Sequence, residues 1–527
     1  MTTINHDARD WISASRPRGS APRPSLRAGL LGVAALLVAP ACGYRPPRFV
    51  DAPPALRVDD MTPVPVPAHR TLLAPLNDAN IYVRRELVRA MDPRRAGDAG
   101  DVNALDGVPE SSWFHRLPVF DKPLLGYRRD GAPVQPLIES KDAPVSGLPG
   151  ARVFVDARGL RFELVPDDAE RPGMRIGAMA ATSRLLFALG YRTDEVNVVE
   201  HAGSRFAATR WPVGIDLGPT PQDRPRRDDP NDRLDHRDRR SLRAFKLAAA
   251  WLDIVHVPPR CLRDHYVGEP GKGHVEHAFV GIDGGLGVDR YQERLAWQRD
   301  PERSDDNLFL RMVSLGLSPV PAASPPGTPF PSVGLLEDHL LVGSFKPSPP
   351  FEPIDRLTPG DAYWMAKRIA TVPPRVFQRA AFSSRMPNDA QRWLARTLEE
   401  RRAAVVAWGY DRVSPLEAGF LHAADPTRGR GPRFQLVDLA VMSGMTSSAT
   451  SRYDVRYLDA DGAALGFARA VVPVGAVVTL ELPASVVSRE RVVVRVTALR
   501  AGVPLPRAAE FHLVRRPSGF AVVGVRH

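Results

Sequence analysis

Residues 251–264 read WLDIVHVPPRCLRD, and this stretch joins a helical pattern to a strand pattern. Before it, apolar residues recur at positions i, i+3, i+7 and i+10, which is one face of a helix. These residues are Leu242, Phe245, Ala249 and Leu252. After it, Tyr266-Val267 and His274-Val275 flank a glycine-rich turn at 268–273, which predicts a hairpin. The stretch therefore predicts a buried helix, a loop and a hairpin in direct succession.

Upstream of this stretch the patterns are mixed. Residues 151–156 and 160–165 predict a β-hairpin, and residues 178–189 predict a helix that Gly190 ends. Residues 223–240 alternate Arg with Asp, which predicts a solvated loop entering a helix.

Downstream of residue 226 the patterns are mostly helical. Thr358 followed by Pro359 is a helix start, and Asn388 with Gln391 resembles a capping box for a helix that Gly409 would stop. The proline-rich stretch 318–353 is predicted to be a surface insertion.

The last hundred residues alternate apolar and polar side chains in several short runs. Such runs occur around Tyr453, Val494, Phe511 and Val523, with the turn 459–462 after the first of them. Several short alternating strands separated by turns are typical of a small antiparallel β-sandwich.

Four stretches occur in an order that is known from one family. They read DGVPESSWF at 106–114, RDDPND at 227–232, RRSLR at 239–243, and WL at 251–252 with the residues through Asp264. Together they resemble an uncharacterised family of bacterial envelope proteins, and the similarity continues through DAYW at 361–364 and ERR at 400–402 into the β-rich tail. The resemblance covers most of the chain after residue 42.

That family's own pattern resembles the core of protein-kinase-like and phosphoinositide-kinase-like proteins. In such a core one loop carries a catalytic Asp and a metal-binding Asn, and the next loop begins with a metal-binding Asp. A Lys on a strand pairs with a Glu on a helix. The resemblance places these roles in this chain on His256, Cys261, Gly281, on Glu163 or Val165, and on Met179. At all five positions the residue is neutral, apolar or of opposite charge to the one that the kinase core uses. The resemblance therefore implies a catalytically degenerate core with no cofactor.

Two residues keep an active ATP-dependent phosphotransferase open as an alternative. Asp283 would be the metal ligand if two residues were deleted before Leu286, and Lys141 would supply the cation, with ATP and Mg²⁺ as cofactors. Otherwise Asp283 is a turn residue and Lys141 a solvated lysine. A secreted hydrolase or effector also stays open, because a site assembled from distant loops leaves no local signature.

Histidines and tryptophans near these motifs are predicted to be structural. His274 and His277 are three residues apart in a predicted strand, so they point to opposite faces and do not share a zinc ion. Together with His256, Cys261 and His265 they could suggest a zinc site, but dispersed residues that bind no metal are the favoured interpretation. Trp113 and Trp251 are predicted to be core anchors.

Composition excludes some classes of protein. The chain has 527 residues, 43% of them hydrophobic and 25% charged, which indicates two or three folded domains and not a disordered chain. The net charge of +11 comes from arginine, with 6 Lys among the 71 basic residues. High-GC coding bias produces such usage, and no Lys/Arg run of nucleic-acid-binding type occurs, so no nucleic-acid partner is expected.

The N-terminus has the pattern of an export signal. Arginines at 16, 18, 23 and 27 precede an apolar run at 28–38, which is too short to span a bilayer. Small residues at 39–41 then precede Cys42, and this order resembles a bacterial lipobox, in which the Cys is lipidated. Ala39-Pro40-Ala41 also fits an ordinary cleavage site for soluble secretion. Gly43 in place of Asp resembles lipoproteins of the outer membrane, facing either the periplasm or the surface.

The sequence thus predicts an α+β protein in five parts. They are a signal peptide (1–41), a Pro-rich tether (42–75), a β-rich N-lobe (76–225), a helical C-lobe (226–428) that carries the insertion 318–353, and a β-sandwich (429–527). The two lobes form a bilobal kinase-like core. The predicted function is binding or scaffolding in the cell envelope, with a membrane contact through the lipid on Cys42 and an unknown envelope protein or ligand as partner.

Overall fold

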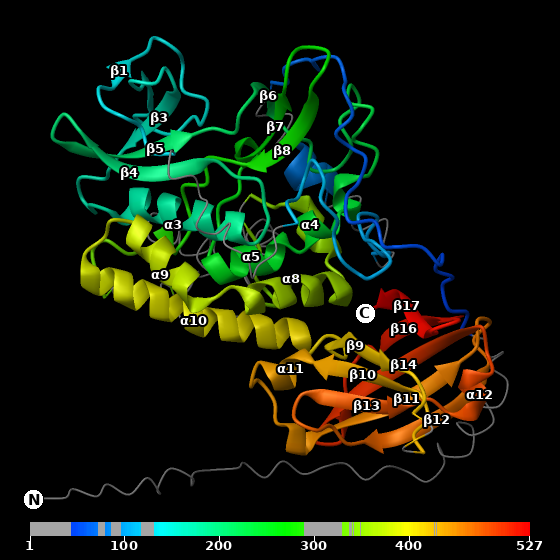
Figure 1. Ribbon diagram of the computed structural model, residues 1–527. Coiled ribbons are helices and arrows are strands. Elements are labelled where there is room, and N and C mark those ends of the chain that lie inside the picture. The colour runs from blue at the N-terminus through cyan, green and yellow to red at the C-terminus, as the bar shows by residue number, and fades with distance from the viewer. Residues whose placement is uncertain are drawn as a thin grey trace, which may run out of the picture. The chain divides into compact units, whose positions relative to one another are not determined.

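The first sheet forms where the sequence predicts a hairpin. In the computed structural model β2 (Arg152–Val155) and β3 (Arg161–Pro166) pair antiparallel, with Arg152 opposite Leu164. The complete sheet has the order β1-β2-β3-β5-β4 and only antiparallel pairs, which confirms this hairpin (Figure 1). Its other strands are β1 (Ile138–Glu139), β4 (Glu195–His201) and β5 (Ser204–Arg210).

Helix α3 (Met174–Ala188) packs on this sheet. Its side chains Ile176 and Met179 share a buried apolar cluster with Val165 of β3 and Ala207 of β5. The helix begins before the predicted residue 178, because Gly173, at φ +85°, turns the chain directly ahead of Met174.

The stretch that follows residue 240 folds largely as its pattern predicts. Two consecutive helices, α4 (Arg240–Arg243) and α5 (Phe245–Leu252), replace the single predicted helix. A three-stranded sheet of order β6-β7-β8 follows, in which β7 (Leu262–Val267) and β8 (His274–Phe279) form the predicted hairpin. Strand β6 is Ile215–Pro219.

Three longer helices, α8 (Pro359–Thr371), α9 (Pro374–Ser383) and α10 (Asn388–Tyr410), complete the main apolar core with α5. The Thr358 start is confirmed as a capping box with Asp361. Helix α10 begins at Asn388, where the sequence predicts a helix start, but the predicted capping box and the predicted stop at Gly409 are wrong. Its N-cap is Pro387, with no side-chain cap, and Gly409 lies inside the helix.

The C-terminal region contains two antiparallel sheets that share one buried apolar cluster. One has the order β13-β10-β9 and the other β12-β11-β14-β16-β17, with β15 paired to β14. Their strands are β9 (Leu416–His422), β10 (Arg433–Asp438), β11 (Ser451–Leu458), β12 (Ala464–Val471), β13 (Val477–Glu481), β14 (Arg491–Arg500), β15 (Val503–Pro504), β16 (Ala509–Arg516) and β17 (Gly519–Arg526). The short helices α11 (Leu439–Met442) and α12 (Ala484–Val487) lie between strands. The alternating runs therefore form strands as predicted.

Several single-turn helices lie in the connections. They are η1 (Asn80–Arg84), η3 (His236–Asp238), η4 (Pro259–Cys261), η5 (Glu352–Arg356) and η7 (Ser448–Thr450).

The predicted tether is not a free spacer where the structure describes it. Residues 46–71 form no helix, but they pack along the folded body. The Asp60 carboxylate accepts hydrogen bonds from the Ser112 amide and hydroxyl, at 3.1 and 2.8 Å. The Tyr266 hydroxyl donates to the Val64 carbonyl at 2.8 Å. These contacts satisfy the backbone of a segment whose composition alone indicates a linker.

The described part of the predicted surface insertion 318–353 also differs from expectation. Val333, Phe345 and Phe351 are buried in the main core cluster. Apolar side chains within the proline-rich stretch are thus used for packing, because the helical core leaves space that they fill.

The structure describes residues 44–71, 79–85, 96–116, 131–288, 329–336, 340, 342–347, 349–425, 427 and 429–527. Cys42 and the rest of the predicted export signal lie outside them. Residues 46–527 cluster as one unit and residues 1–45 as another. Within the described residues no helix has the length and apolar character of a membrane span. The chain is an α+β protein with mixed helices and antiparallel sheets.

Candidate functional site

Three of the positions that the kinase resemblance singles out meet in one place. Cys261 ends η4, directly before β7, and Gly281 and Asp283 follow β8. Because β7 and β8 form a hairpin, these two ends of it are adjacent. The Cys261 Sγ lies 3.5 Å from the Gly281 carbonyl oxygen, and Arg260 Nη1 donates to the same oxygen at 3.2 Å. The structure therefore brings Cys261, Gly281 and Asp283 into one loop cluster.

The Asp283 carboxylate is held by two arginines. Arg175 Nη2, from α3, lies 2.8 Å from Asp283 Oδ2, and Arg260 Nη2 lies 3.3 Å from Oδ1. Asp283 and Arg175 have side chains that are only 14% and 15% exposed. A magnesium ion needs carboxylate oxygens that are open to it, and here both oxygens already face a guanidinium. Asp283 is therefore an ion-pair partner in this arrangement.

Glu163, one of the two residues at the strand lysine position, is also engaged. It is buried, and its carboxylate accepts hydrogen bonds from the amides of Val145 and Ser146, at 2.9 and 3.1 Å, and from the Ser146 hydroxyl. Burial raises the pKa of Glu163 against the lowering effect of these hydrogen bonds. This side chain fastens the loop before β2 to β3 and offers no cation to a phosphate.

Asp194 is a site residue that the sequence analysis missed. It lies directly before β4, is buried, and accepts a hydrogen bond from the Gly281 amide at 2.8 Å. Burial raises its pKa to about 7, and the nearby Glu163 acts in the same direction. No motif surrounds it in the sequence, since only the fold brings the start of β4 to the loop after β8.

The space around Gly281 is filled by the protein's own side chains. A Cβ atom at this position, where φ is +60°, would lie 3.7 Å from Ser146 Cβ and 4.0 Å from both Trp211 Cη2 and Arg260 Nη1. The loop around Ser146 and the segment after β5 that carries Trp211 therefore close over the position that the metal-binding Asp would occupy.

The remaining predicted positions are Met179, Val165, Lys141 and His256. Met179 and Val165 are buried in the apolar cluster between α3 and the first sheet. Lys141 is exposed after β1. His256 is half-buried in the loop after α5.

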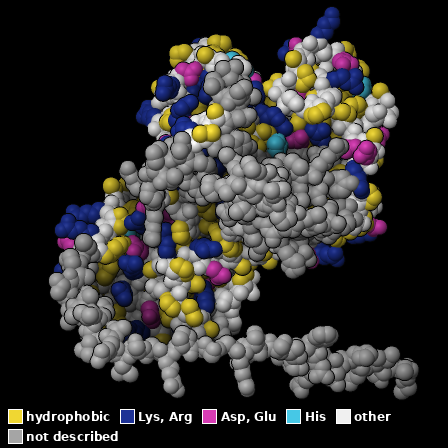
Figure 2. Space-filling model, turned by 180° about the vertical axis from the view of Figure 1, so that it is seen from behind, with side chains coloured by type: hydrophobic (Ala, Val, Ile, Leu, Met, Phe, Trp, Pro, Cys, Tyr) yellow, Lys and Arg dark blue, Asp and Glu magenta, His cyan; other side chains and the backbone are white. Residues whose placement is uncertain are grey.

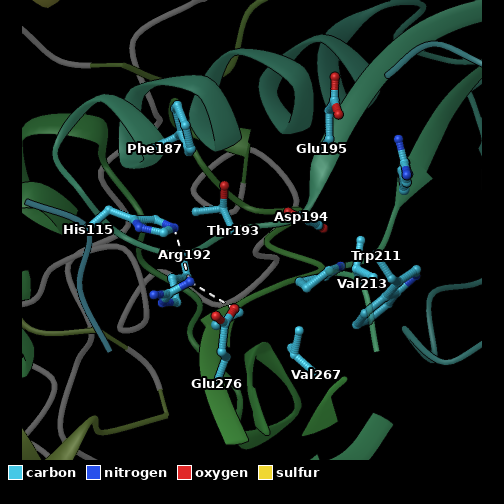
Figure 3. Close-up of a pocket in the computed structure, with 13 residues that line it drawn as sticks. His115, Phe187, Arg192, Thr193, Asp194, Glu195, Trp211, Val213, Val267 and Glu276 are labelled. Atoms are coloured by element: carbon cyan, nitrogen blue, oxygen red, sulfur yellow. Dashed lines mark hydrogen bonds and ion pairs between the residues drawn. The ribbon is translucent and has the colours of Figure 1, made fainter. Parts of the chain in front are cut away.

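A cavity of about 410 Å³ adjoins this cluster (Figure 3). Asp194, Thr193, Trp211 and Glu276 are among its lining residues. Arg192, at its edge, is bonded to Glu276 at 2.8 Å and to His115 at 3.1 Å, so its charge is compensated. Arg210 also lines the cavity and has no ion-pair partner among the described residues. The cavity therefore offers a guanidinium and a buried acid to a polar ligand.

The other three family-like stretches, 106–114, 227–232 and 239–243, meet in a buried polar network. The Trp113 ring stacks on His277 at 3.9 Å and meets His236 edge-on at 4.4 Å, with Arg239 above it at 4.7 Å. Asp232 accepts from His236 Nε2 at 2.7 Å and from Arg239 Nη2 at 3.0 Å. The prediction that residues 223–240 are solvated is wrong, because opposite charges from this stretch pair with one another inside the protein.

Trp113 and Trp251 are core anchors, as predicted. Trp113 is 3% exposed and Trp251 is fully buried, with its Nε1 donating to the Leu398 carbonyl at 2.8 Å. The two strand histidines have separate partners: His277 Nδ1 bonds to Asp264 at 2.8 Å and His274 to Glu276 at 3.3 Å. In the described ranges no three His, Cys, Asp or Glu side chains are placed to hold a metal ion.

Comparison with known proteins does not assign a family to the chain. No protein-family model matches it, and no curated protein matches it. Among solved structures the chain is similar to the crystal structure of a Helicobacter pylori proinflammatory kinase, CtkA, with 9% identity and a TM-score of 0.32, over 53% of this chain and 98% of that chain. Similarity at this level carries no argument about activity.

Proposed function

We propose that this protein is an exported envelope lipoprotein in which a bilobal kinase-like core binds a partner or ligand without transferring phosphate. In this proposal the first sheet with α3 is the N-lobe, the helices around α5, α8 and α10 are the C-lobe, and the two C-terminal sheets form a β-sandwich. The main support for an absence of phosphotransfer is the pairing of Asp283 with Arg175 and Arg260. It removes the last carboxylate that the kinase resemblance leaves for a metal.

Charge complementarity supports the same conclusion. Mg·ATP is anionic and needs carboxylates on the metal and cations on the phosphates, and each charge-assisted contact contributes about 1.5–3 kcal/mol. Glu163 would repel phosphates, and Lys141 is exposed. The cavity beside Asp194 is a suitable place for a peptide ligand, whose carbonyl or carboxylate oxygens the Arg210 guanidinium can bind.

We expect Mg·ATP at millimolar concentration to leave the melting temperature of the purified protein unchanged, and to transfer no γ-phosphate to protein or lipid. The measurement is a thermal-shift titration with ATP in Mg²⁺ and in EDTA, together with a radiolabel transfer assay. A matched control is Asp461→Ala, which removes an exposed carboxylate. A Mg²⁺-dependent stabilisation by ATP that Asp283→Ala abolishes and Asp461→Ala retains would establish the phosphotransferase alternative with Asp283 and Lys141.

The lipoprotein part of the proposal is supported by the export pattern that ends at Cys42. We expect Cys42→Ser to move the protein from the membrane pellet to the soluble fraction, because lipidation requires the thiol. Cys261→Ser is the matched control and stays in the pellet, since Cys261 is buried in the core. A Cys42→Ser protein that still pellets after a salt wash would contradict lipid anchoring.

No nucleic-acid partner is proposed. On the face seen in Figure 2, Lys and Arg side chains are interspersed with acidic and apolar side chains. Nucleic-acid surfaces instead gather basic residues on one stripe or face. The proposed partners are the membrane, through the lipid, and an envelope protein or ligand.

A further inference from the structure

The chain enters the folded body beside the C-terminal six-stranded sheet, and Phe49 holds it there. The Phe49 ring lies 4.6 Å from the His512 ring, and the Phe49 carbonyl accepts from Arg491 Nη1 at 2.8 Å. A Cβ atom at Gly524 would lie 2.3 Å from the Phe49 ring, so only glycine leaves room for it. Phe49, which we call the plug, therefore packs against β16 and β17 and, through its carbonyl, binds β14, so that it fixes the chain on this sheet.

Ion pairs on both sides of Phe49 show which end of the sheet this is. Arg48 pairs with Asp461 in the β11–β12 turn at 3.0 Å, and Asp51 pairs with Arg516, which ends β16. Register places the ends of β11 and β16 at the start of β14, because Leu458 lies opposite Val493 and the β16 residue Val514 opposite Arg491. We call this end, with turns 459–463, 488–490 and 517–518, the proximal end.

The chain between Cys42 and this end is short. Only Gly43, Tyr44 and Arg45 separate Cys42 from Pro46, which is buried. Four fully extended steps of chain span at most about 14 Å. Strand β14 has 10 residues, so the opposite end of the sheet is roughly 30 Å further away. A lipid on Cys42 therefore tethers the proximal end and not the opposite one.

The proximal end has the chemistry of a headgroup-facing surface. Arg48 is 74% exposed and pairs with Asp461, whereas Arg489 and Arg515 are exposed with no side-chain partner among the described residues; Glu490, between them in the chain, is also exposed. The exposed apolar residues Val472, which follows β12, and Val503, which begins β15, lie at the opposite end of the sheet. Guanidinium groups bind phosphate oxygens well, and unpaired ones at a bilayer surface contact lipid phosphates.

We propose that the proximal end lies against the phosphate headgroups of the bilayer that holds the Cys42 lipid, so that Phe49 orients the whole body on the membrane. This inference rests on the proposed lipoprotein function. The opposite end of the sheet, with β15, then points away from the membrane and is free to meet a partner.

The experiment compares two single-cysteine labels on the full, lipidated chain. Ser518→Cys places a fluorophore in the exposed turn of the proximal end, and Val503→Cys places one on β15, where Val503 is 67% exposed. Cys261 is buried and the Cys42 thiol carries the lipid, so labelling is selective. In vesicles with an acceptor dye on the lipid headgroups, we expect energy-transfer efficiency at 518 to be at least twice that at 503.

Each other outcome overturns a defined part of the inference. If the protein floats with the vesicles but the two efficiencies are equal, or the one at 503 is larger, the orientation is wrong while the anchor stands. If the protein with intact Cys42 does not float, both the lipid anchor and the proposed orientation are wrong.

A variant of the plug tests the role of Phe49. Phe49→Ala is expected to bring the ratio of the two efficiencies toward one while the protein still floats and keeps its circular dichroism spectrum. Phe49→Leu, which retains an apolar plug, is expected to keep most of the difference. An unchanged ratio in Phe49→Ala would show that the plug does not orient the body.

Discussion

Replacing Asp264 by asparagine is expected to lower the free energy of unfolding by about 3–5 kcal/mol, because it breaks a buried network of charges. Asp264 is fully buried, and its carboxylate accepts from His277 Nδ1 at 2.8 Å and from Arg226 Nη1 at 2.9 Å, as well as from the Thr220 hydroxyl. Arg226 keeps Asp228 as a second partner, whereas His277 loses the carboxylate it faces. Urea unfolding of both proteins at pH 7 measures the difference.

A surface ion pair provides the control for Asp264. Asp461→Asn breaks the pair with Arg48, whose two side chains are 74% and 81% exposed, and is expected to cost less than about 1 kcal/mol. Equal losses in the two variants would show that the Asp264 network does not stabilise the fold.

Acid sensitivity gives a second readout of the same carboxylate. Burial alone would raise the pKa of Asp264, but His277, Thr220 and Arg226 lower it to about 2. A carboxyl group whose pKa is lower in the folded state stabilises the protein above its ordinary pKa of 3.8, and this contribution is lost as pH falls toward 2. The wild-type protein is therefore expected to lose stability more steeply than Asp264→Asn between about pH 4 and pH 2.

Replacing Gly409 by alanine is expected to destabilise the protein by about 1–3 kcal/mol, although alanine is the better helix former. A Cβ atom at position 409 would lie 2.4 Å from the Ala366 Cβ of α8 and 3.0 Å from the Ala362 carbonyl oxygen. Real Cβ contacts are longer, so α8 and α10 must move apart to accept it. Thermal or urea unfolding measures the loss.

The opposite substitution in the same helix is the matched control. Ala403 is exposed on α10, and Ala403→Gly is expected to lose about 1 kcal/mol through helix propensity alone. Both substitutions then destabilise α10 although they exchange the same two residues in opposite directions. A gain of stability in Gly409→Ala would mean that the two helices are not in close contact there.

Local sequence determined those elements whose stabilising contacts are close in the chain. The hairpins 151–165 and 266–275 need only strand-forming side chains and a turn, and the Thr358 start needs only a hydroxyl and an acid three residues later. The burial of Trp113 and Trp251 also followed from residue type, since large aromatic side chains gain most from leaving water. These features were predictable because distant residues neither create nor cancel them.

Only the tertiary structure decided the roles of Gly409, Asp283, Asp194 and the segment 46–71. Gly409 would stop an isolated helix, but here its missing side chain lets α10 approach α8. Asp283 is paired by Arg175, which lies 108 residues earlier in the chain, and Asp194 meets Gly281 across 87 residues. Free energy of ion pairing and burial depends on which groups come within a few ångströms of each other, and spacing in the sequence does not contain that information.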